Sequence, residues 1–177
     1  CTVTPRSKPM SFLAIWPCPK RVMARGHGGA VAGGSDVALC CDLIVMDEKA
    51  RIGYPPARVW GCPTTAMWVY RVGAEQAKRL LFTGDLITGA EAKAIGLVLD
   101  AVPAAALDDA VRALTDRIRG VPKNQLMMMK LMVNQAYENM GLASTQMVAT
   151  LFDGMARHTP EGVAFKQRAE AAGFKQA

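Results

Sequence analysis

The spacing of apolar residues divides the chain into two parts. After about Val102, apolar residues recur every three or four positions, as in the stripe from Leu107 to Ile118, which is typical of helices with one buried face. The same period continues almost to the end of the chain. The helices expected there cover residues 107–118, 126–137, 144–158 and 160–172. We therefore predict a helical region over residues 103–177, preceded by a region of different character over residues 1–102.

The first region has short apolar runs that glycine and proline interrupt. A strand at 20–24, a glycine-rich loop, a helix that begins at Ser35 or Asp36, and a strand at 42–46 together predict a βαβ unit. Further helices are expected at 64–72, 74–82 and 90–95, and a last strand at 98–102. The proline-rich run 54–63 predicts a structured loop, because its prolines remove hydrogen-bond donors and fix φ.

Length and composition are those of one folded domain. The chain has 177 residues, of which 51% are hydrophobic and 20% charged, enough for a proper core. No run approaches the roughly 20 apolar residues of a membrane span, and the start does not read as a signal peptide, so we expect a cytoplasmic protein with no membrane span. The five cysteines have no metal-ligand spacing; no metal site is expected, and Cys40 and Cys41 are predicted to pack in the core.

The net charge of +6 leaves two kinds of partner open. Nucleic-acid binding is disfavoured, because the lysines and arginines are scattered and only three tyrosines and five phenylalanines are available for stacking. An anionic small molecule explains the charge equally well. We therefore expect a small-molecule partner and no nucleic acid.

The most informative local feature is the glycine-rich loop at 26–34. A glycine loop that leads into a helix N-terminus gathers unpaired N–H groups and the positive end of the helix dipole, which suits a phosphate or a carbonyl oxygen that gains charge. Neither phosphate motif is present: GxxxxGK[ST] does not occur, and Val31 stands where GxGxxG begun at Gly26 needs its third glycine. A loop that only makes a tight turn is the alternative.

Several ordered motifs resemble the crotonase (enoyl-CoA hydratase/isomerase) family. The segment Cys18-Pro19-Lys20, the run from His27 to Asp36, and Ala38-Leu39-Cys40-Cys41-Asp42 look like the family's central strand, glycine turn and helix. Matches also follow in order at 50–53, 77–84, 90–98 and 165–168. The resemblance spans about Pro17 to Phe174.

This resemblance implies an α/β fold, a spiral of ββα units, with a C-terminal helical region that builds homotrimers, often paired into hexamers. It implies binding of an acyl-CoA thioester, with coenzyme A as part of the substrate and no separate cofactor, and hydration or isomerisation in fatty-acid metabolism. By the same carry-over, Gly33 is one of two N–H donors to the thioester oxygen and Asp36 is the first catalytic carboxylate. The substrate-binding residues implied are Gly29, Val31, Gly34, Pro55, Pro56 and Trp60.

The chain also departs from the family pattern. The family's second N–H donor belongs to its first third, which this sequence does not contain, so the resemblance is to a truncated member. Of the two glutamates that position water in hydratases, the first is replaced by the shorter Asp36 and the second by Pro56, which cannot transfer a proton. The alternative is therefore a catalytically impaired remnant or a subunit-interaction module. For Trp60, a wall of the acyl pocket and simple packing of the loop stay equally open, and His27 is expected to be structural.

Overall fold

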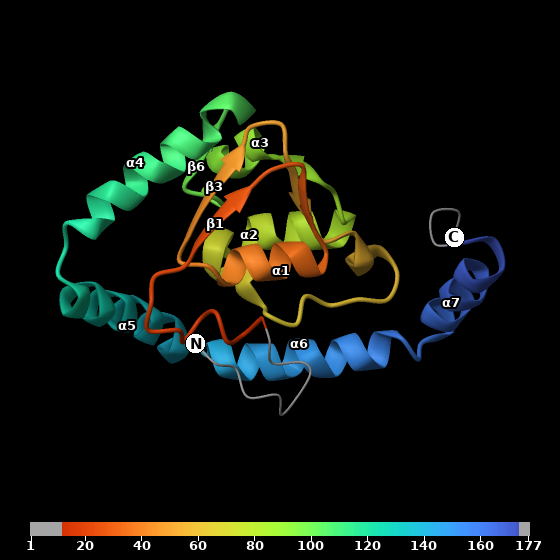
Figure 1. Ribbon diagram of the computed structural model, residues 1–177. Coiled ribbons are helices and arrows are strands. Elements are labelled where there is room, and N and C mark those ends of the chain that lie inside the picture. The colour runs from red at the N-terminus through yellow and green to blue at the C-terminus, as the bar shows by residue number, and fades with distance from the viewer. Residues whose placement is uncertain (1–11, 174–177) are drawn as a thin grey trace.

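The computed structural model describes residues 12–173 (Figure 1). Its strands are β1 (Met23–Gly26), β2 (Gly29–Val31), β3 (Leu43–Asp47), β4 (Arg51–Gly53), β5 (Ile87–Thr88) and β6 (Asp100–Val102). Its α-helices are α1 (Gly33–Cys40), α2 (Met67–Thr83), α3 (Gly89–Ala94), α4 (Leu107–Arg119), α5 (Lys123–Asn139), α6 (Leu142–Ala156) and α7 (Pro160–Ala172). Two 3₁₀ turns, η1 (Pro55–Arg58) and η2 (Ala104–Ala106), complete the order.

The strands form two three-stranded sheets. In the first, β1 and β6 each pair in parallel with the central strand β3; in the second, β4 pairs in parallel with β2 and antiparallel with β5. The chain runs from β1 through α1 to the parallel neighbour β3, which is the βαβ unit that the sequence predicts. In chain order, β1 and β2 are followed by α1, and β3 and β4 by α2, which gives the predicted α/β architecture.

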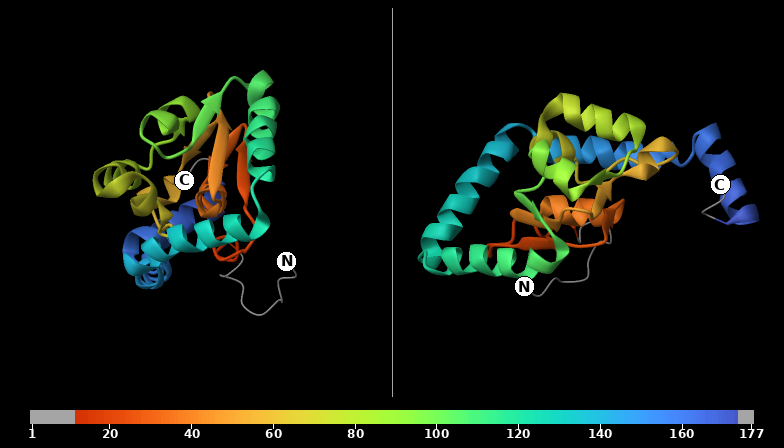
Figure 2. Two further views of the ribbon diagram at one scale, coloured as in Figure 1. Left: turned by 90° about the vertical axis from the view of Figure 1, so that its left-hand side faces the viewer. Right: turned by 90° about the horizontal axis from the view of Figure 1, so that it is seen from above.

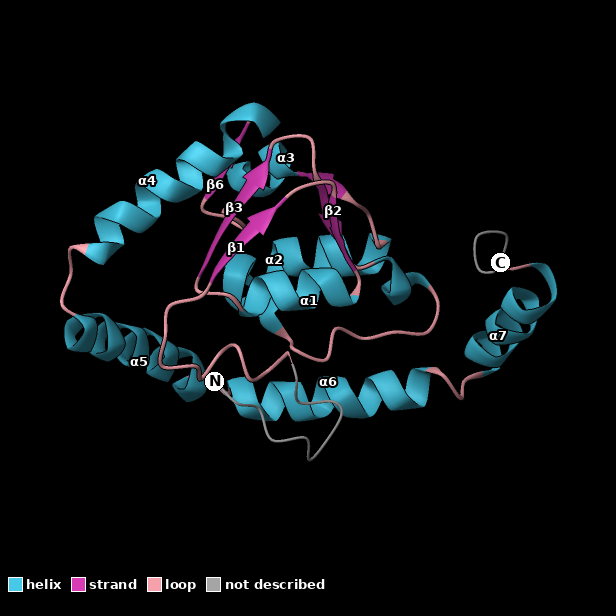
Figure 3. Ribbon diagram, in the orientation of Figure 1, coloured by secondary structure: helices cyan, strands magenta, loops and turns pink. Residues whose placement is uncertain are grey.

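The helices enclose the sheets and then extend beyond them. Figure 2 shows α4 along one side of the β1-β3-β6 sheet, with α2 and α3 on the other. In Figure 3, α5 and α6 continue below the sheets, and α7 stands at the far end of this row. Among the described residues after Val102, the structure holds helices and turns but no strand, in keeping with the predicted helical region.

The core lies between α1, α2 and the two sheets. Leu39 on α1, Ile44 on β3, Ile52 on β4 and Trp68 on α2 are almost completely buried. Leu142 at the start of α6 joins the same cluster. Cys40 and Cys41 are buried as predicted, so both behave as small hydrophobic side chains.

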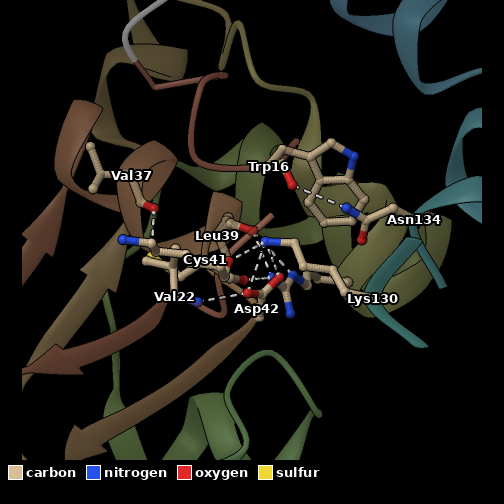
Figure 4. Close-up of polar contacts among 10 residues, drawn as sticks. Trp16, Val22, Val37, Leu39, Cys41, Asp42, Lys130 and Asn134 are labelled. Carbon is tan, nitrogen blue, oxygen red and sulfur yellow. Dashed lines mark hydrogen bonds and ion pairs between the residues drawn. The ribbon is translucent and has the colours of Figure 1, made fainter. Parts of the chain in front are cut away.

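A polar cluster at the end of α1 attaches α5 to this core (Figure 4). The Asp42 carboxylate accepts the Val22 N–H at 2.7 Å and pairs with the Lys130 ammonium at 2.9 Å. Lys130 is 7% exposed, so a cation from the helical region is almost fully buried beside β1 and β3. The Arg71 guanidinium donates to the Leu39 carbonyl oxygen at 2.8 Å, which satisfies the end of α1.

The predicted and observed strands differ where a side chain binds a backbone group or where a strand depends on a distant partner strand. The first begins at Met23 and not at residue 20, because the Val22 N–H is bound by the Asp42 side chain. Within the predicted glycine loop, residues 29–31 form β2, which exists because it pairs with β4. Neither β4 nor β5, three and two residues long, was predicted.

The helices agree more closely with the sequence. The helices expected at 64–72 and 74–82 are the two halves of α2, which is broken at Gly73, where φ is +74°. α1 begins at Gly33, two residues earlier than predicted. α7 matches its predicted range, and the Thr159 side chain caps it by accepting the Gly162 N–H.

Candidate active site

The glycine loop ends in a strained junction at the start of α1. Ala32, the N-cap of α1, has φ +54°, an uncommon conformation for a residue with a side chain. Its N–H donates to the Gly53 carbonyl oxygen at 3.0 Å, which ties the junction to β4. Gly33 and Gly34 follow in the first helical turn, where N–H groups have no intrahelical acceptor. The glycine loop therefore does lead into a helix N-terminus; anion binding there stays a prediction.

Gly33 and Gly34 differ in how much space lies beside them. A Cβ on Gly33 would lie 3.7 Å from the Phe12 ring, whereas a Cβ on Gly34 would meet nothing within 4 Å. Within residues 12–173, Phe12 is the one side chain that such a Cβ would approach within 4 Å, and it is itself 37% exposed. A flat group could approach the backbone at this point because no Cβ stands in the way.

Asp36 points into the protein. It is 3% exposed, and its Oδ1 accepts a hydrogen bond of 2.6 Å from the Thr65 hydroxyl. Thr65 is completely buried in the segment just before α2. Residue 66, which follows it, is the other alanine with a positive φ among the described residues. Two unusual backbone positions thus flank the Asp36–Thr65 pair, a distribution common at functional sites.

Burial changes the acidity of this carboxyl group. Removal from water raises the pKa of Asp36 from 3.8 to about 6; the Thr65 hydrogen bond opposes the rise and the negative charge of Asp153 adds to it. A carboxyl group with a pKa near neutrality can both accept and donate a proton under ordinary conditions. Asp36 is therefore suited to acid–base chemistry.

The loop between η1 and α2 joins α1 to α6. Thr65 bonds to Asp36 through its hydroxyl, while its carbonyl oxygen accepts the Gln146 side-chain N–H at 3.0 Å. The Cys62 N–H donates to Asp153 Oδ1 at 3.1 Å. Sequence reasoning assigned no role to Thr65 or Asp153, because no motif or spacing connects residues 36, 65 and 153.

The residues of the proline turn and the loop after it contact one another and the C-terminal helices. Pro55 and Pro56 are partly buried in η1, where the Pro56 carbonyl oxygen accepts the Trp60 N–H at 3.1 Å. The Trp60 ring contacts the Phe165 ring edge-on at 5.1 Å, and the Arg157 guanidinium lies 5.8 Å from its centre. Trp60 thus packs the loop against α6 and α7, which is the packing role that the sequence left open beside a pocket role.

A cavity of about 420 Å³ lies between β1 and α1 and is bordered by the glycine loop. Gly29 and Gly34 line it, together with His27 and Arg25. Gly33 and Asp36 are not among its lining residues, and neither are Val31, which is 40% exposed, or the proline turn. Of the candidate residues, Gly29 and Gly34 therefore lie beside this cavity, whereas Asp36 lies against Thr65.

Thiol and metal chemistry find little support. Burial raises the pKa of the Cys40 thiol to about 12 and also raises the pKa values of Cys41 and Cys62, so the reactive thiolate is disfavoured. Within residues 12–173, no three His, Cys, Asp or Glu side chains are grouped to hold a metal ion. In the same part of the chain, no helix has the length and apolar character needed to cross a bilayer.

Comparison with solved structures gives close matches. The enoyl-CoA hydratase of Mycobacterium smegmatis superposes with a TM-score of 0.89 at 49% sequence identity, over 93% of this chain and 56% of that one. The parallel sheets and C-terminal helices described above are therefore those of the crotonase fold.

Sequence comparison agrees. The enoyl-CoA hydratase/isomerase family profile matches residues 5–173. A Thermus thermophilus protein assigned provisionally as an enoyl-CoA hydratase is 36% identical over 84% of this chain and 59% of its own length. The mitochondrial enoyl-CoA hydratase of Pongo abelii is 31% identical over 72% of this chain and 46% of its own length. This chain thus spans about half to three-fifths of its relatives, and it belongs to the enoyl-CoA hydratase/isomerase (crotonase) family.

Proposed function

We propose that the chain binds an acyl-CoA thioester and polarises its carbonyl group for hydration or isomerisation, as an enoyl-CoA hydratase-type lyase. The supporting observation is the free start of α1: the Gly33 N–H lies in the first helical turn without an intrahelical acceptor, and a developing enolate oxygen is an anion that such a donor stabilises. The family relationship supports the ligand class.

In this proposal Asp36 exchanges a proton with substrate or water. Its pKa of about 6 supports that role, and Thr65 holds one carboxyl oxygen in place. The second N–H donor would come from a region that precedes these residues in longer relatives. Turnover of crotonyl-CoA, followed by loss of the enoyl absorbance, separates this enzyme from a remnant that only binds the ligand.

The direct test is calorimetric titration with acetoacetyl-CoA, whose enolate resembles the charged intermediate. We expect saturable binding that Gly33→Pro abolishes, since proline lacks the N–H but is tolerated at the first helical position. Gly34→Pro is the matched variant, because it removes the next N–H and leaves that of Gly33. Folding of each variant is checked by circular dichroism. A folded wild-type chain that does not bind would refute the proposal.

We also propose that the helical region assembles copies of the chain into a homotrimer or hexamer. On α5, Leu131 and Met132 are 54% and 68% exposed; on α6, Met147 and Leu151 are 69% and 59% exposed. Monomeric proteins seldom leave so many large apolar side chains in water. These helices are the region that the family resemblance assigns to assembly, and this favours a second copy of the chain as the partner.

A further inference from the structure

The proline at position 56 leaves the site with one carboxylate, yet a second one approaches from the helical region. Asp153 is on α6, 117 positions after Asp36, and its side chain is 15% exposed. Its Oδ1 accepts the Cys62 N–H at 3.1 Å and its Oδ2 accepts from the Arg157 guanidinium at 2.8 Å. Both oxygens are thus held, one by the loop and one by a cation on the same helix.

The geometry brings this carboxylate to the same loop that holds Asp36. Gln146 and Asp153 are seven positions apart on α6, two helical turns, and therefore share one face of the helix. Gln146 binds the carbonyl oxygen of Thr65, and Asp153 binds the N–H of Cys62. Because the Thr65 hydroxyl binds Asp36, the loop lies between α1 and α6 with a carboxylate on each side.

A buried phenol bonded to the same loop supports this arrangement. Tyr54 is 8% exposed, and its hydroxyl donates to the Cys62 carbonyl oxygen at 3.0 Å. After burial, the charges of Asp36 and Asp153 are the next largest causes that raise the pKa of Tyr54. The charges of both carboxylates therefore act on one side chain, which is itself bonded to the loop residue that Asp153 holds.

We propose that Asp153 is a second carboxylate that supports the site from α6: held by the Cys62 N–H and by Arg157, it fixes the loop that holds Asp36 and acts on Asp36 through its charge, without taking over the proton transfer of the family glutamate that Pro56 replaces. Asp153 is here a positioning residue. It fixes the loop that carries Thr65, and its negative charge keeps a proton on Asp36 to higher pH. This inference deepens the proposed function and rests on it only for the substrate.

Other ionisable groups also face Asp36 and enter the interpretation. They are the thiol of Cys40 on α1, the phenol of Tyr54 before η1 and the carboxylate of Asp153 on α6. Behind them, the guanidinium of Arg71 on α2 acts on Cys40, and Arg157 pairs with Asp153. Both the thiol and the phenol have raised pKa values and stay neutral around pH 6. Asp153 is therefore the charged neighbour of Asp36 at this pH, and a single substitution of Asp153 removes that charge.

The test is a pH titration of the full chain labelled with ¹³C at the aspartate carboxyls, with the Asp36 signal assigned from Asp36→Asn. In wild type we expect a midpoint near 6. Asp153→Asn should lower it, because a like charge is removed, whereas Thr65→Val should raise it, because a hydrogen bond to the carboxylate is lost. Opposite shifts from two neighbours of one group are not expected from general loosening of the fold.

Asp116→Asn is the matched control, because Asp116 is an exposed aspartate paired with Arg119 on α4, and it should leave the midpoint unchanged. A folded Asp153→Asn variant with the wild-type Asp36 midpoint would overturn the inference. The titration needs no ligand, so failure of acetoacetyl-CoA to bind would refute the proposed function and leave this result to be judged separately.

Discussion

Replacement of Asp36 by asparagine should reveal the energetic cost of keeping an ionised carboxylate inside the protein. At high pH the wild-type carboxyl group is charged while it is 3% exposed. Asparagine is nearly the same size, keeps an oxygen that can accept from the Thr65 hydroxyl, and carries no charge. The variant therefore changes the titration of the site and little of its shape.

The magnitude follows from the pKa in each state. The folded-state pKa of about 6 lies above the ordinary value of 3.8, so between these pH values the folded chain holds a proton that the unfolded chain has lost. Wild-type stability therefore falls as the pH rises through this window, by about 3 kcal/mol in total. About 2 kcal/mol of this change lies between pH 4.5 and 8. The variant lacks this dependence.

The assay is urea unfolding, monitored by the fluorescence of the buried Trp16 and Trp68, for wild type and variant across that pH range. The variant amide group adds a cost that does not depend on pH, because one buried N–H₂ needs a new acceptor. The informative quantity is therefore how the difference in unfolding free energy between variant and wild type changes with pH. We expect the variant to gain about 2 kcal/mol relative to wild type between pH 4.5 and 8. A difference that stays flat would refute the burial argument.

Two further predictions concern the helical region. Lys130→Met should destabilise the chain by about 3 kcal/mol or more, because it leaves the mostly buried Asp42 carboxylate without its cation; a loss below about 1 kcal/mol in urea unfolding would contradict this. Met132→Glu should lower the particle mass measured by light scattering, because it places a charge on the exposed α5 face, whereas Phe82→Glu, on α2 and 79% exposed, should not. Equal effects of the two glutamates would argue against assembly through α5.

The sequence predicted best the elements that local patterns determine. The helices from Leu107 onward follow from a 3.6-residue apolar period, and their ranges agree with the structure to within a few residues. The break at Gly73 was also predicted from a local signal, because glycine readily adopts a positive φ. Short strands such as β5, with two residues, depend on a partner distant in sequence, and no local signal specifies them.

The residues of the candidate site also differ in whether the sequence could predict them. Gly33 and Asp36 were assigned from the family resemblance, which rests on a glycine loop and a first-turn carboxylate within ten residues of sequence. Thr65 was not found, because its role depends on one hydrogen bond between elements 29 positions apart. The raised pKa of Asp36 likewise depends on tertiary burial, which the sequence alone did not supply.

On the role proposed for Asp153, replacement of a carboxylate at position 56 leaves the acidity of Asp36 dependent on a second element, α6. A catalytic carboxylate matters through its charge and its location, and either can be supplied by another element that reaches the same point. Here α6 reaches the loop before α2 through Gln146 and Asp153, so the helical region is tied to the segment that holds Asp36. If the two carboxylates titrate as a coupled pair, the helical region cannot be removed without changing the acidity of Asp36.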